Sequence, residues 1–367
     1  MNWNWQQKDW PNFRYQANEF SHYERDFQHN AGVMAGSIKH ITADDQELLR
    51  VSLVSDEALK TSEIEGELLN RDSLQSSVRR QFGLKTDERR ISPAEQGISE
   101  MLVDLYQHYQ SPMTHEQLFA WHRMLTNGRR DLRAIGTYRN HGEPMQIVSG
   151  KIYDPTVHYE APPSSRVFNE MERFITWFNE TGASQRVGPT TLLRAGIAHL
   201  YFESIHPFED GNGRIGRAIS EKALSQSLGR PTLIAIATVI EKKRKNYYAA
   251  LQAGSRSLEI DKWLHYFCQM VLLAQEYTQQ KIDFLINKGK FYQCFANRLN
   301  KRQAKVIEHV FREGVERFTG GLSAENYISL TSTSRATATR DLQDLVAMGA
   351  LIKTGERKQT RYYLGEY

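Results

Sequence analysis

Apolar residues recur at helical spacing through much of the chain. Leu193, Ile197 and Leu200 follow one another at intervals of three or four in a stretch rich in alanine and leucine. This spacing predicts a buried helix over residues 190–205. A second row with the same spacing consists of Val167, Met171, Phe174 and Phe178. The chain is therefore expected to be mostly α-helical.

The segment 136–165 has a different pattern. The run Gln146–Ser149 and the following run Gly150–Asp154 predict two short strands that are joined near Ser149 and Gly150. An exposed edge of such a hairpin suits an extended peptide, which can add to a sheet as a further strand. An ordinary surface hairpin is the alternative interpretation.

The C-terminal region resembles a winged helix-turn-helix. Helices are expected over 301–311, 323–328 and 335–348, and strands over 351–353 and 361–364. The third helix would present its first residues to base edges and phosphates. The candidate DNA contacts are Arg335, Thr337 and Arg340 on that helix and Arg357 and Lys358 on the hairpin. The same architecture also serves in dimerisation and in protein docking.

Composition agrees with these interpretations. The chain has 367 residues, which predicts two or three domains, and its 40% hydrophobic and 25% charged residues are typical of a soluble globular protein. Residues 295–367 hold 12 lysines and arginines against 8 aspartates and glutamates, a net charge of +4 that equals the charge of the whole chain. A DNA-binding module would carry such an excess, although Asp341, Asp344 and Glu356 dilute it.

Several classes of protein are disfavoured. Cys268 and Cys294 form neither a metal-binding nor a disulfide pattern, which suits a reducing cytoplasm. The sequence has no signal peptide and no apolar run long enough to span a bilayer, so we expect a cytoplasmic protein without a membrane partner. His115 and Glu116 lack the second histidine of the zinc-protease pattern H-E-x-x-H.

The most informative stretch is residues 206–217, which read HPFEDGNGRIGR. His206 is a base that titrates near neutral pH, and Asp210 is a hard oxygen ligand of the kind that Mg²⁺ prefers. The flexible turn Gly211–Gly213 can direct its amide groups toward an anion. A helix that begins at this turn would add its positive end to the same place.

Arg214 and Arg217 lie three residues apart and so share one face of that helix. Two guanidinium groups beside an anion-binding turn suit a nucleoside triphosphate, because phosphoryl and nucleotidyl transfer are catalysed mainly by positioning and charge neutralisation. Each residue alone would more often be an ordinary core or surface group. The ordered set within one turn and one helix predicts phosphoryl or nucleotidyl transfer.

The glycines at 211, 213 and 216 also match the dinucleotide-binding pattern G-x-G-x-x-G. That pattern requires a preceding β-strand, whereas residues 190–205 have helical spacing. We therefore reject a dinucleotide-binding fold.

Residues 206–217 resemble the full signature of the Fic (filamentation induced by cAMP) family. Further matches are Trp121–Leu125, Gly136–Arg139 and Asn246–Leu251, so the resemblance covers roughly residues 95–280. It implies a mostly helical catalytic domain with a β-hairpin flap. Members of the family mostly transfer AMP from ATP to a hydroxyl side chain of a target protein. The Gly-Asn-Gly-Arg core is intact here, which favours AMP transfer over the phosphate transfer of relatives with a degraded turn.

The resemblance assigns roles residue by residue. His206 would take the proton from the target Ser, Thr or Tyr hydroxyl, and Asp210 would hold the Mg²⁺ that bridges the α- and β-phosphates of ATP. Arg217 would orient the γ-phosphate. The phosphate-binding residues would be Gly211, Asn212, Gly213, Arg214 and Arg217, and other nucleotide-binding residues would be Asn246, Tyr247 and Tyr248. Nothing in the motif selects the base, so use of another nucleoside triphosphate stays open.

Upstream, Thr61–Gly66 reads TSEIEG and fits the pattern [S/T]-x-x-x-E-[G/N], which resembles the inhibitory helix of Fic proteins. Glu65 would pair with Arg217 through a strong, directional carboxylate–guanidinium contact and deny it to the γ-phosphate. In some relatives the same glutamate helps to remove AMP from the target, which leaves removal open as a second activity. The alternative is that Glu65 is one acid of a charged helix over 56–70 and has no partner.

Together these features predict a helical N-terminal module with the inhibitory helix over residues 1–95, a Fic catalytic domain over 96–285 and a winged helix-turn-helix over 295–367. The expected function is AMP transfer to a target protein or to the protein itself, held back by Glu65. A nucleotide-sensing, DNA-binding transcriptional regulator is the alternative. A homodimer is expected.

Overall fold

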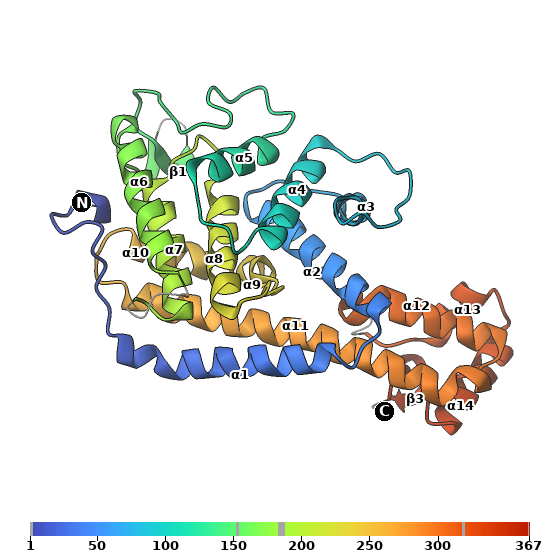
Figure 1. Ribbon diagram of the computed structural model, residues 1–367. Coiled ribbons are helices and arrows are strands. Elements are labelled where there is room, and N and C mark those ends of the chain that lie inside the picture. Colours follow the sequence, from blue (N-terminus) through green and yellow to red (C-terminus); the bar gives the residue numbers. More distant parts are fainter. Residues whose placement is uncertain (1–2, 152–153, 183–187, 318–319, 366) are drawn as a thin grey trace. The chain divides into compact units, whose positions relative to one another are not determined.

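The protein is mostly helical, as its sequence predicts (Figure 1). The computed structural model describes residues 3–151, 154–182, 188–317, 320–365 and 367. Within these ranges the side chains of residues 149–151, 154–155, 313, 315–317 and 358 are not described. Among the described residues, no helix is both long and apolar enough to cross a lipid bilayer.

The chain forms two compact units. The first consists of residues 1–32 and 50–278, and the second of residues 33–49 and 279–367. The boundaries fall within helices α1 (Ser21–Ile38), α2 (Ala43–Ile64) and α11 (Asp261–Phe295). Each unit has its own apolar core.

Two buried helices form the centre of the first unit. They are α7 (Thr191–Ile205) and α8 (Asn212–Leu228), which pack against each other. Every residue of α7 from Leu192 to Ile205 is buried. A helix that is buried on all sides belongs to a core, and Figure 1 shows α8 between α7 and α4 (Pro93–Gln107). The helix predicted before residue 206 is confirmed.

Other helices cover this pair. Helices α4 and α5 (His115–Leu125) pack against α8, and α6 (Ser164–Glu180) packs against α7. A reciprocal cap fixes the start of α4, since the Ser92 hydroxyl accepts from the Glu95 amide and the Glu95 carboxylate accepts from the Ser92 amide. The predicted apolar row lies buried on α6: Val167, Met171, Phe174 and Phe178. Further helices of this unit are α3 (Arg71–Gln81), α9 (Ile236–Lys242) and α10 (Arg244–Gly254).

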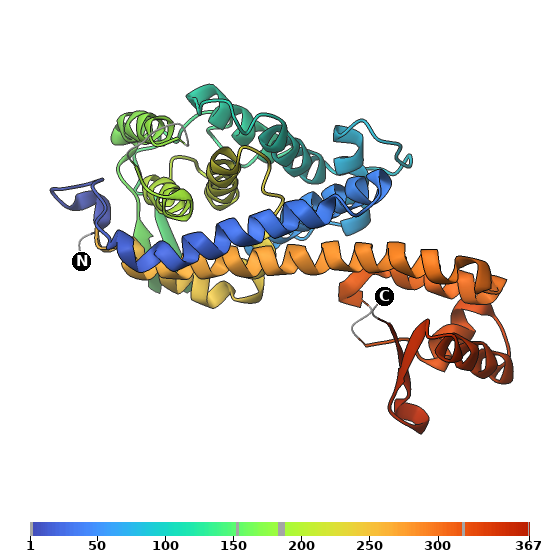
Figure 2. The same cartoon turned by 60° about the horizontal axis from the view of Figure 1, so that its bottom comes forward.

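Within the first unit, α1 lies along α11 (Figure 2). The Gln275 side chain donates to the Phe27 carbonyl at 3.1 Å, and the Gln269 side chain donates to the Tyr23 hydroxyl at 3.1 Å. Phe27 itself is fully buried. The two helices are therefore joined by side-chain hydrogen bonds beside a buried phenylalanine.

The N-terminal segment packs onto the same unit through its tryptophans. It contains the short 3-10 helices η1 (Asn4–Gln6) and η2 (Ala17–Phe20). Trp3, Trp5 and Trp10 are buried. The Trp5 indole donates to the Glu160 carbonyl at 2.8 Å, which anchors the end of the hairpin described next.

An antiparallel hairpin of β1 (Gln146–Lys151) and β2 (Asp154–Glu160) precedes α6. The predicted hairpin is present, but the expected turn at Ser149 and Gly150 is wrong, because both residues lie inside β1 and pair with β2. Strand pairing holds them extended, and this context overrides the local turn preference of a Ser-Gly pair. The connecting residues 152–153 lie outside the described residues.

In the described part of the second unit, three helices are followed by two antiparallel strands, in the predicted order. They are α12 (Lys301–Arg317), α13 (Ala324–Thr331), α14 (Arg335–Ala347), β3 (Leu351–Thr354) and β4 (Arg361–Leu364), with the short helices η3 (Ala296–Arg298) and η4 (Arg357–Gln359). The hydroxyls of Ser323 and Ser334 cap α13 and α14. The core of this unit includes Phe291, Ile307, Leu342 and Tyr362. Assignment as a winged helix-turn-helix stays a prediction.

Candidate active site

His206 lies directly after α7, where the chain turns. Its backbone is left-handed with φ of 49°, and its amide donates to the Phe202 carbonyl at 3.0 Å. The buried guanidinium of Arg139 fixes the turn by donating to the carbonyls of His206 at 2.8 Å and Pro162 at 2.6 Å. Burial and the charge of Arg139 lower the pKa of His206 to about 4. The imidazole is therefore neutral at pH 7 and able to accept a proton.

The Asn212 side chain closes the turn that follows His206. Its carbonyl oxygen accepts from the Phe208 amide at 2.9 Å, and its amide nitrogen donates to the Phe208 carbonyl at 2.8 Å. Phe208 stacks on His122 of α5, with ring centroids 4.3 Å apart. The side chain of Asn212 thus shapes the turn and leaves its main-chain amide for an anion.

Helix α8 begins at this turn. Gly211 precedes the first helical residue with φ of 82°, a conformation that glycine adopts without strain. The first amide groups of a helix have no partner within the helix, and its positive dipole end lies there. The predicted anion-binding residues Gly211, Asn212 and Gly213 therefore lie together at a helix N-terminus.

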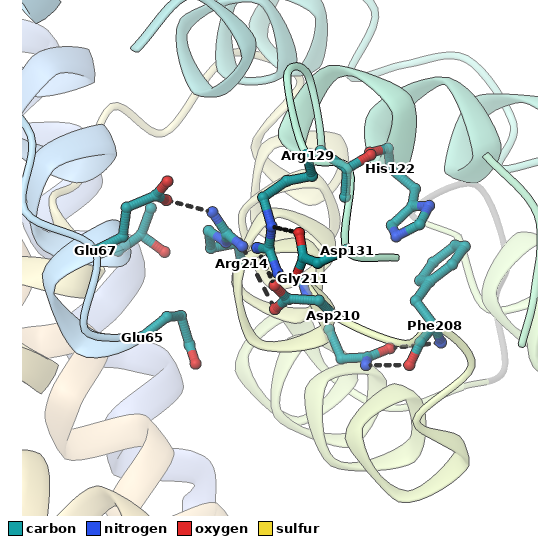
Figure 3. A network of polar contacts seen from close by, with 12 residues as sticks. Glu65, Glu67, His122, Arg129, Asp131, Phe208, Asp210, Gly211 and Arg214 are labelled. Carbon is teal, nitrogen blue, oxygen red and sulfur yellow. Dashed lines mark hydrogen bonds and ion pairs between the residues drawn. The ribbon is translucent and has the colours of Figure 1, made fainter. Parts of the chain in front are cut away.

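A chain of ion pairs runs across the turn (Figure 3). The Asp210 carboxylate lies 2.5 Å from Arg129, which also contacts Asp131 at 2.6 Å. Arg214 is buried and lies 2.6 Å from Glu67 and 3.6 Å from Asp210. Although burial opposes it, the charges of Arg214 and Arg129 lower the pKa of Asp210, so its carboxylate is ionised. The predicted metal ligand and one predicted phosphate ligand thus have internal partners.

Glu65 lies at the same end of α8. Since α2 ends at Ile64, Glu65 belongs to the turn after the helix and not to a longer charged helix. One carboxylate oxygen lies 2.6 Å from Arg217 Nη2, and the Thr61 hydroxyl accepts from Arg217 Nε at 2.7 Å. A Cβ atom at Gly213 would lie 2.2 Å from the same oxygen of Glu65. The structure brings Glu65 and Arg217 together, and Glu65 covers Gly213.

A cavity of about 460 Å³ lies between the hairpin, α7 and α10. Its lining includes Ile147 and His158 of the hairpin, Leu200 and Glu203 of α7, and Lys245, Tyr248 and Gln252 of α10. Cavities of this volume hold small organic ligands. Glu203 is three residues before His206, so the cavity adjoins the end of α7 that carries the candidate base.

The three predicted nucleotide-binding residues of α10 are placed differently. Tyr248 lines the cavity, and its hydroxyl donates to the Ile64 carbonyl at 3.2 Å. Tyr247 is buried, and its hydroxyl hydrogen-bonds with His199 at 2.8 Å. Asn246 is exposed. Of the three, Tyr248 is the residue that faces the cavity.

Sequence reasoning missed several residues of this site. Arg129 and Arg139 come from the loop between α5 and β1. Nothing in the local sequence marks Arg129, whereas Arg139 ends the matching stretch Gly136–Arg139 but was given no role. Glu67 directly follows the inhibitory pattern Thr61–Gly66 and lies two positions after Glu65. Glu203 could have been noticed from the sequence, because it lies in the helix that was predicted to be buried, and a glutamate is rarely fully buried unless it is paired.

The candidate DNA contacts lie on α14 and in η4 of the second unit. Arg340 and Arg357 are exposed, and Thr337 is partly buried. Arg335 is exposed but forms an ion pair with a glutamate of α13 at 3.0 Å. The Lys358 side chain lies outside the described residues.

The fold and the site define a helical domain in which a buried histidine precedes a glycine-containing turn at a helix N-terminus and two arginines. Residues 112–224 match the Fic/DOC family, and residues 3–84 match a domain of unknown function, DUF4172. The chain therefore contains a Fic/DOC family domain.

Two solved structures share this fold. A Fic family protein from Desulfovibrio desulfuricans has a TM-score of 0.52 and 19% sequence identity, with 94% of this chain and 96% of that chain covered. A Fic domain containing signalling protein from Bacteroides thetaiotaomicron has a TM-score of 0.51 and 17% identity, with 71% and 97% covered.

Two relatives are similar over shorter stretches. The protein adenylyltransferase fic-1 of Caenorhabditis briggsae is 26% identical over 117 residues, which are 31% of this chain and 22% of that protein. The protein of the same name from Caenorhabditis elegans is 29% identical over 89 residues, which are 24% and 16% of the two chains. The chain thus spans less than a quarter of the length of either relative.

Proposed function

We propose that the protein transfers AMP from ATP to a Ser, Thr or Tyr hydroxyl of a target protein, or of the protein itself, and that Glu65 inhibits this transfer. The observation that carries the proposal is the convergence of a neutral histidine, an anion-binding turn and two arginines between α7 and α8. Glu65 lies 2.6 Å from Arg217 at this place. The two Caenorhabditis relatives are named as protein adenylyltransferases, which supports the same activity.

In the proposed reaction His206 takes the proton from the target hydroxyl. The hydroxyl oxygen forms a bond to the α-phosphorus of ATP, and the bond from that phosphorus to the oxygen that bridges to the β-phosphate breaks. Pyrophosphate leaves, and the proton passes from His206 to solvent. Arg214, Arg217 and the amide groups of the turn would neutralise the charge that moves onto the phosphates. A base must be unprotonated to start the reaction, and burial keeps His206 neutral.

The donor set fits Mg²⁺ together with ATP. Mg²⁺ usually takes one or two carboxylates and completes its shell with phosphate oxygens and water. Asp210 supplies one ionised carboxylate beside the turn. Among the described residues there is no group of three or more His, Cys, Asp or Glu side chains that would hold a metal ion alone. Asp210 would therefore hold the ion, which would neutralise phosphate charge when bound.

The cavity between the hairpin, α7 and α10 would take the nucleoside half of ATP. Tyr248 and Leu200 contribute aromatic and aliphatic surface to it, and His158, Lys245 and Gln252 contribute polar groups. A mainly apolar cavity with a few polar groups is typical of sites for bases and ribose.

Labelled ATP tests the proposal. Wild type, Glu65→Gly and Glu65→Gly/His206→Ala proteins are incubated with α-³²P-ATP and Mg²⁺, and labelled protein is measured. Strong label in the single variant and none in the double variant is the expected result. Glu63→Gly is the matched control, because Glu63 lies two residues earlier, at the end of α2, and pairs with Lys60, and it should behave as wild type. No label in any variant, despite measurable ATP binding, would contradict the transferase.

Removal of AMP from a modified target is a second activity that Glu65 would support, since it lies beside the turn where a transferred AMP group would be held. Under this alternative Glu65→Gly abolishes release of AMP from a labelled target, whereas under autoinhibition it raises attachment. The same labelled protein, incubated without ATP, separates the two outcomes.

A nucleotide-sensing, DNA-binding regulator is the second candidate function. It is favoured by the exposed Arg340 and Arg357 in the second unit and by the net charge of +4 on residues 295–367. Deletion of residues 299–367 should abolish DNA retention and leave AMP transfer intact. DNA retention that survives the deletion would contradict this role.

We also propose that the protein is cytoplasmic and forms a homodimer. Sedimentation of the purified protein would test the homodimer.

A further inference from the structure

Glu203 lies almost one helical turn before His206, and its carboxyl group faces the histidine ring. Its Oε2 atom lies 3.7 Å from His206 Nδ1, and only 7% of the Glu203 side chain is exposed. Among the described residues, neither Glu203 Oε1 nor His206 Nδ1 has a hydrogen-bond partner, although both atoms are buried. Buried polar atoms without partners are uncommon in native proteins and require an explanation.

The neighbouring helix leaves room for this carboxyl group. A Cβ atom at Gly216 of α8 would lie 2.6 Å from Glu203 Oε1, so a larger residue at Gly216 would displace it. Glu203 also lines the cavity that would take the nucleoside. Packing thus places a carboxyl group beside the candidate base, and among the described residues no arginine or lysine forms an ion pair with it.

We propose that Glu203 is a positioning residue for His206, which fixes the Nδ1–H form of the ring and so leaves Nε2 as the proton acceptor. This inference rests on the AMP transfer proposed above. A neutral imidazole has one N–H and one acceptor nitrogen, and the partner of the N–H decides which nitrogen carries the hydrogen. The Glu203 carboxylate is an acceptor that faces the ring at Nδ1. The carboxylate would also stabilise the imidazolium that forms when Nε2 takes the hydroxyl proton.

The ionisation of Glu203 connects this role to Glu65. Burial and the charge of Glu65 raise the pKa of Glu203 to about 8, and Arg217 opposes them. Among the described residues, the other charged or titratable groups around the pair include Arg139, His158, Tyr159, Asp210, Lys245, Tyr247 and Tyr248. Removing Glu65 takes away a negative charge and leaves the positive charge of Arg217. The pKa of Glu203 should therefore fall. More of the ionised form, which orients the ring, is then present at neutral pH.

The kinetic test uses the Glu65→Gly protein as the active background. Glu203→Gln is added, because it keeps the shape of the side chain but cannot ionise. We expect it to lower kcat for transfer roughly 10- to 100-fold and to leave the KM for ATP within about twofold. The rise of kcat with pH should also disappear. Glu221→Gln is the matched control, because Glu221 is another buried glutamate whose pKa burial raises to about 8, and it should keep kcat and the pH profile.

A second measurement does not depend on transfer. The ¹⁵N NMR signals of the His206 ring, assigned by their loss in His206→Ala, report which nitrogen carries the hydrogen. Glu65→Gly should show the Nδ1–H form, and Glu65→Gly/Glu203→Gln should show a mixture. If Glu65→Gly transfers no AMP, the proposed function fails, but the ring signals still decide the role of Glu203. Ring signals that Glu203→Gln leaves unchanged would overturn the inference. A raised KM for ATP with constant kcat in the kinetic test would also overturn it, because Glu203 would then act on Arg217 and not on His206.

Discussion

The guanidinium group of Arg129 lies 2.5 Å from the carboxylate of Asp210, the residue that the proposed mechanism assigns to Mg²⁺. Asp131 holds Arg129 there, since it accepts from two of its nitrogens at 2.8 and 2.6 Å. A guanidinium group and a divalent cation are attracted to the same carboxylate, so the two compete. Together with the pair of Arg214 and Glu67, this contact satisfies the charges of the site internally (Figure 3).

Replacing Arg129 with alanine should therefore tighten the binding of divalent cations. The two side chains are 37% and 34% exposed, so the pair is worth at most about 1 kcal/mol and the affinity should rise by up to about fivefold. Titration with Mn²⁺ in the presence of ATP, followed by electron paramagnetic resonance, measures the change. Arg130→Ala is the control, because Arg130 is the exposed neighbour. Weaker Mn²⁺ binding in Arg129→Ala would show that Arg129 supports the metal site and does not compete with it.

Glu67 should be a second residue, after Glu65, that weakens the binding of ATP. Arg214 is 5% exposed and lies 2.6 Å from Glu67, so Glu65→Gly alone leaves this arginine paired. Adding Glu67→Gln to Glu65→Gly should lower the Kd for ATP by roughly threefold to tenfold, the equivalent of about 1 kcal/mol. Calorimetry with a non-hydrolysable ATP analogue measures the affinity, and Glu63→Gln serves as the control. An unchanged Kd would mean that the phosphates open the Glu67 contact at no cost.

Glu203 should lower the free energy of unfolding as the pH rises. Its pKa is about 8 in the folded protein against an ordinary value of 4.5. Between these values the folded state keeps a proton that the unfolded chain releases, so the free energy of unfolding falls with increasing pH. Glu203→Gln removes this dependence and should exceed wild type by roughly 2–4 kcal/mol at pH 8, with little difference at pH 4.5. Urea unfolding at the two pH values gives the comparison, and a gain that is equal at both would refute the assigned ionisation.

The residues that the sequence could place are those whose relationships are local. The apolar spacing on α6 encodes its buried face, and His206, Asp210 and Arg214 share one turn and one helix. The pairing of Glu65 with Arg217 was predictable only through the family resemblance, because α2 and α8 are far apart in the chain.

The other contacts between distant segments of the site could not be predicted. The guanidinium of Arg129 reaches Asp210 from a loop whose own sequence has no pattern, and only the folded chain brings them together. The predicted position of the hairpin turn was wrong for a related reason. Ser149 and Gly150 favour a turn by composition, but their pairing with β2 keeps them extended, and strand pairing is a non-local interaction.

Gly216 and Glu203 should have coupled effects on stability. A Cβ atom at Gly216 would lie 2.6 Å from the buried Oε1 of Glu203, so the carboxyl group would have to move. Gly216→Ala should therefore destabilise the wild-type protein by about 1–3 kcal/mol, as overpacking usually does. In a Glu203→Ala background the clash is absent, and the same substitution should stabilise by up to about 1 kcal/mol through helix propensity. Urea unfolding of the four proteins measures this reversal of sign. Equal effects in both backgrounds would show that the carboxyl group moves freely, and that the packing of α8 does not hold Glu203 beside His206.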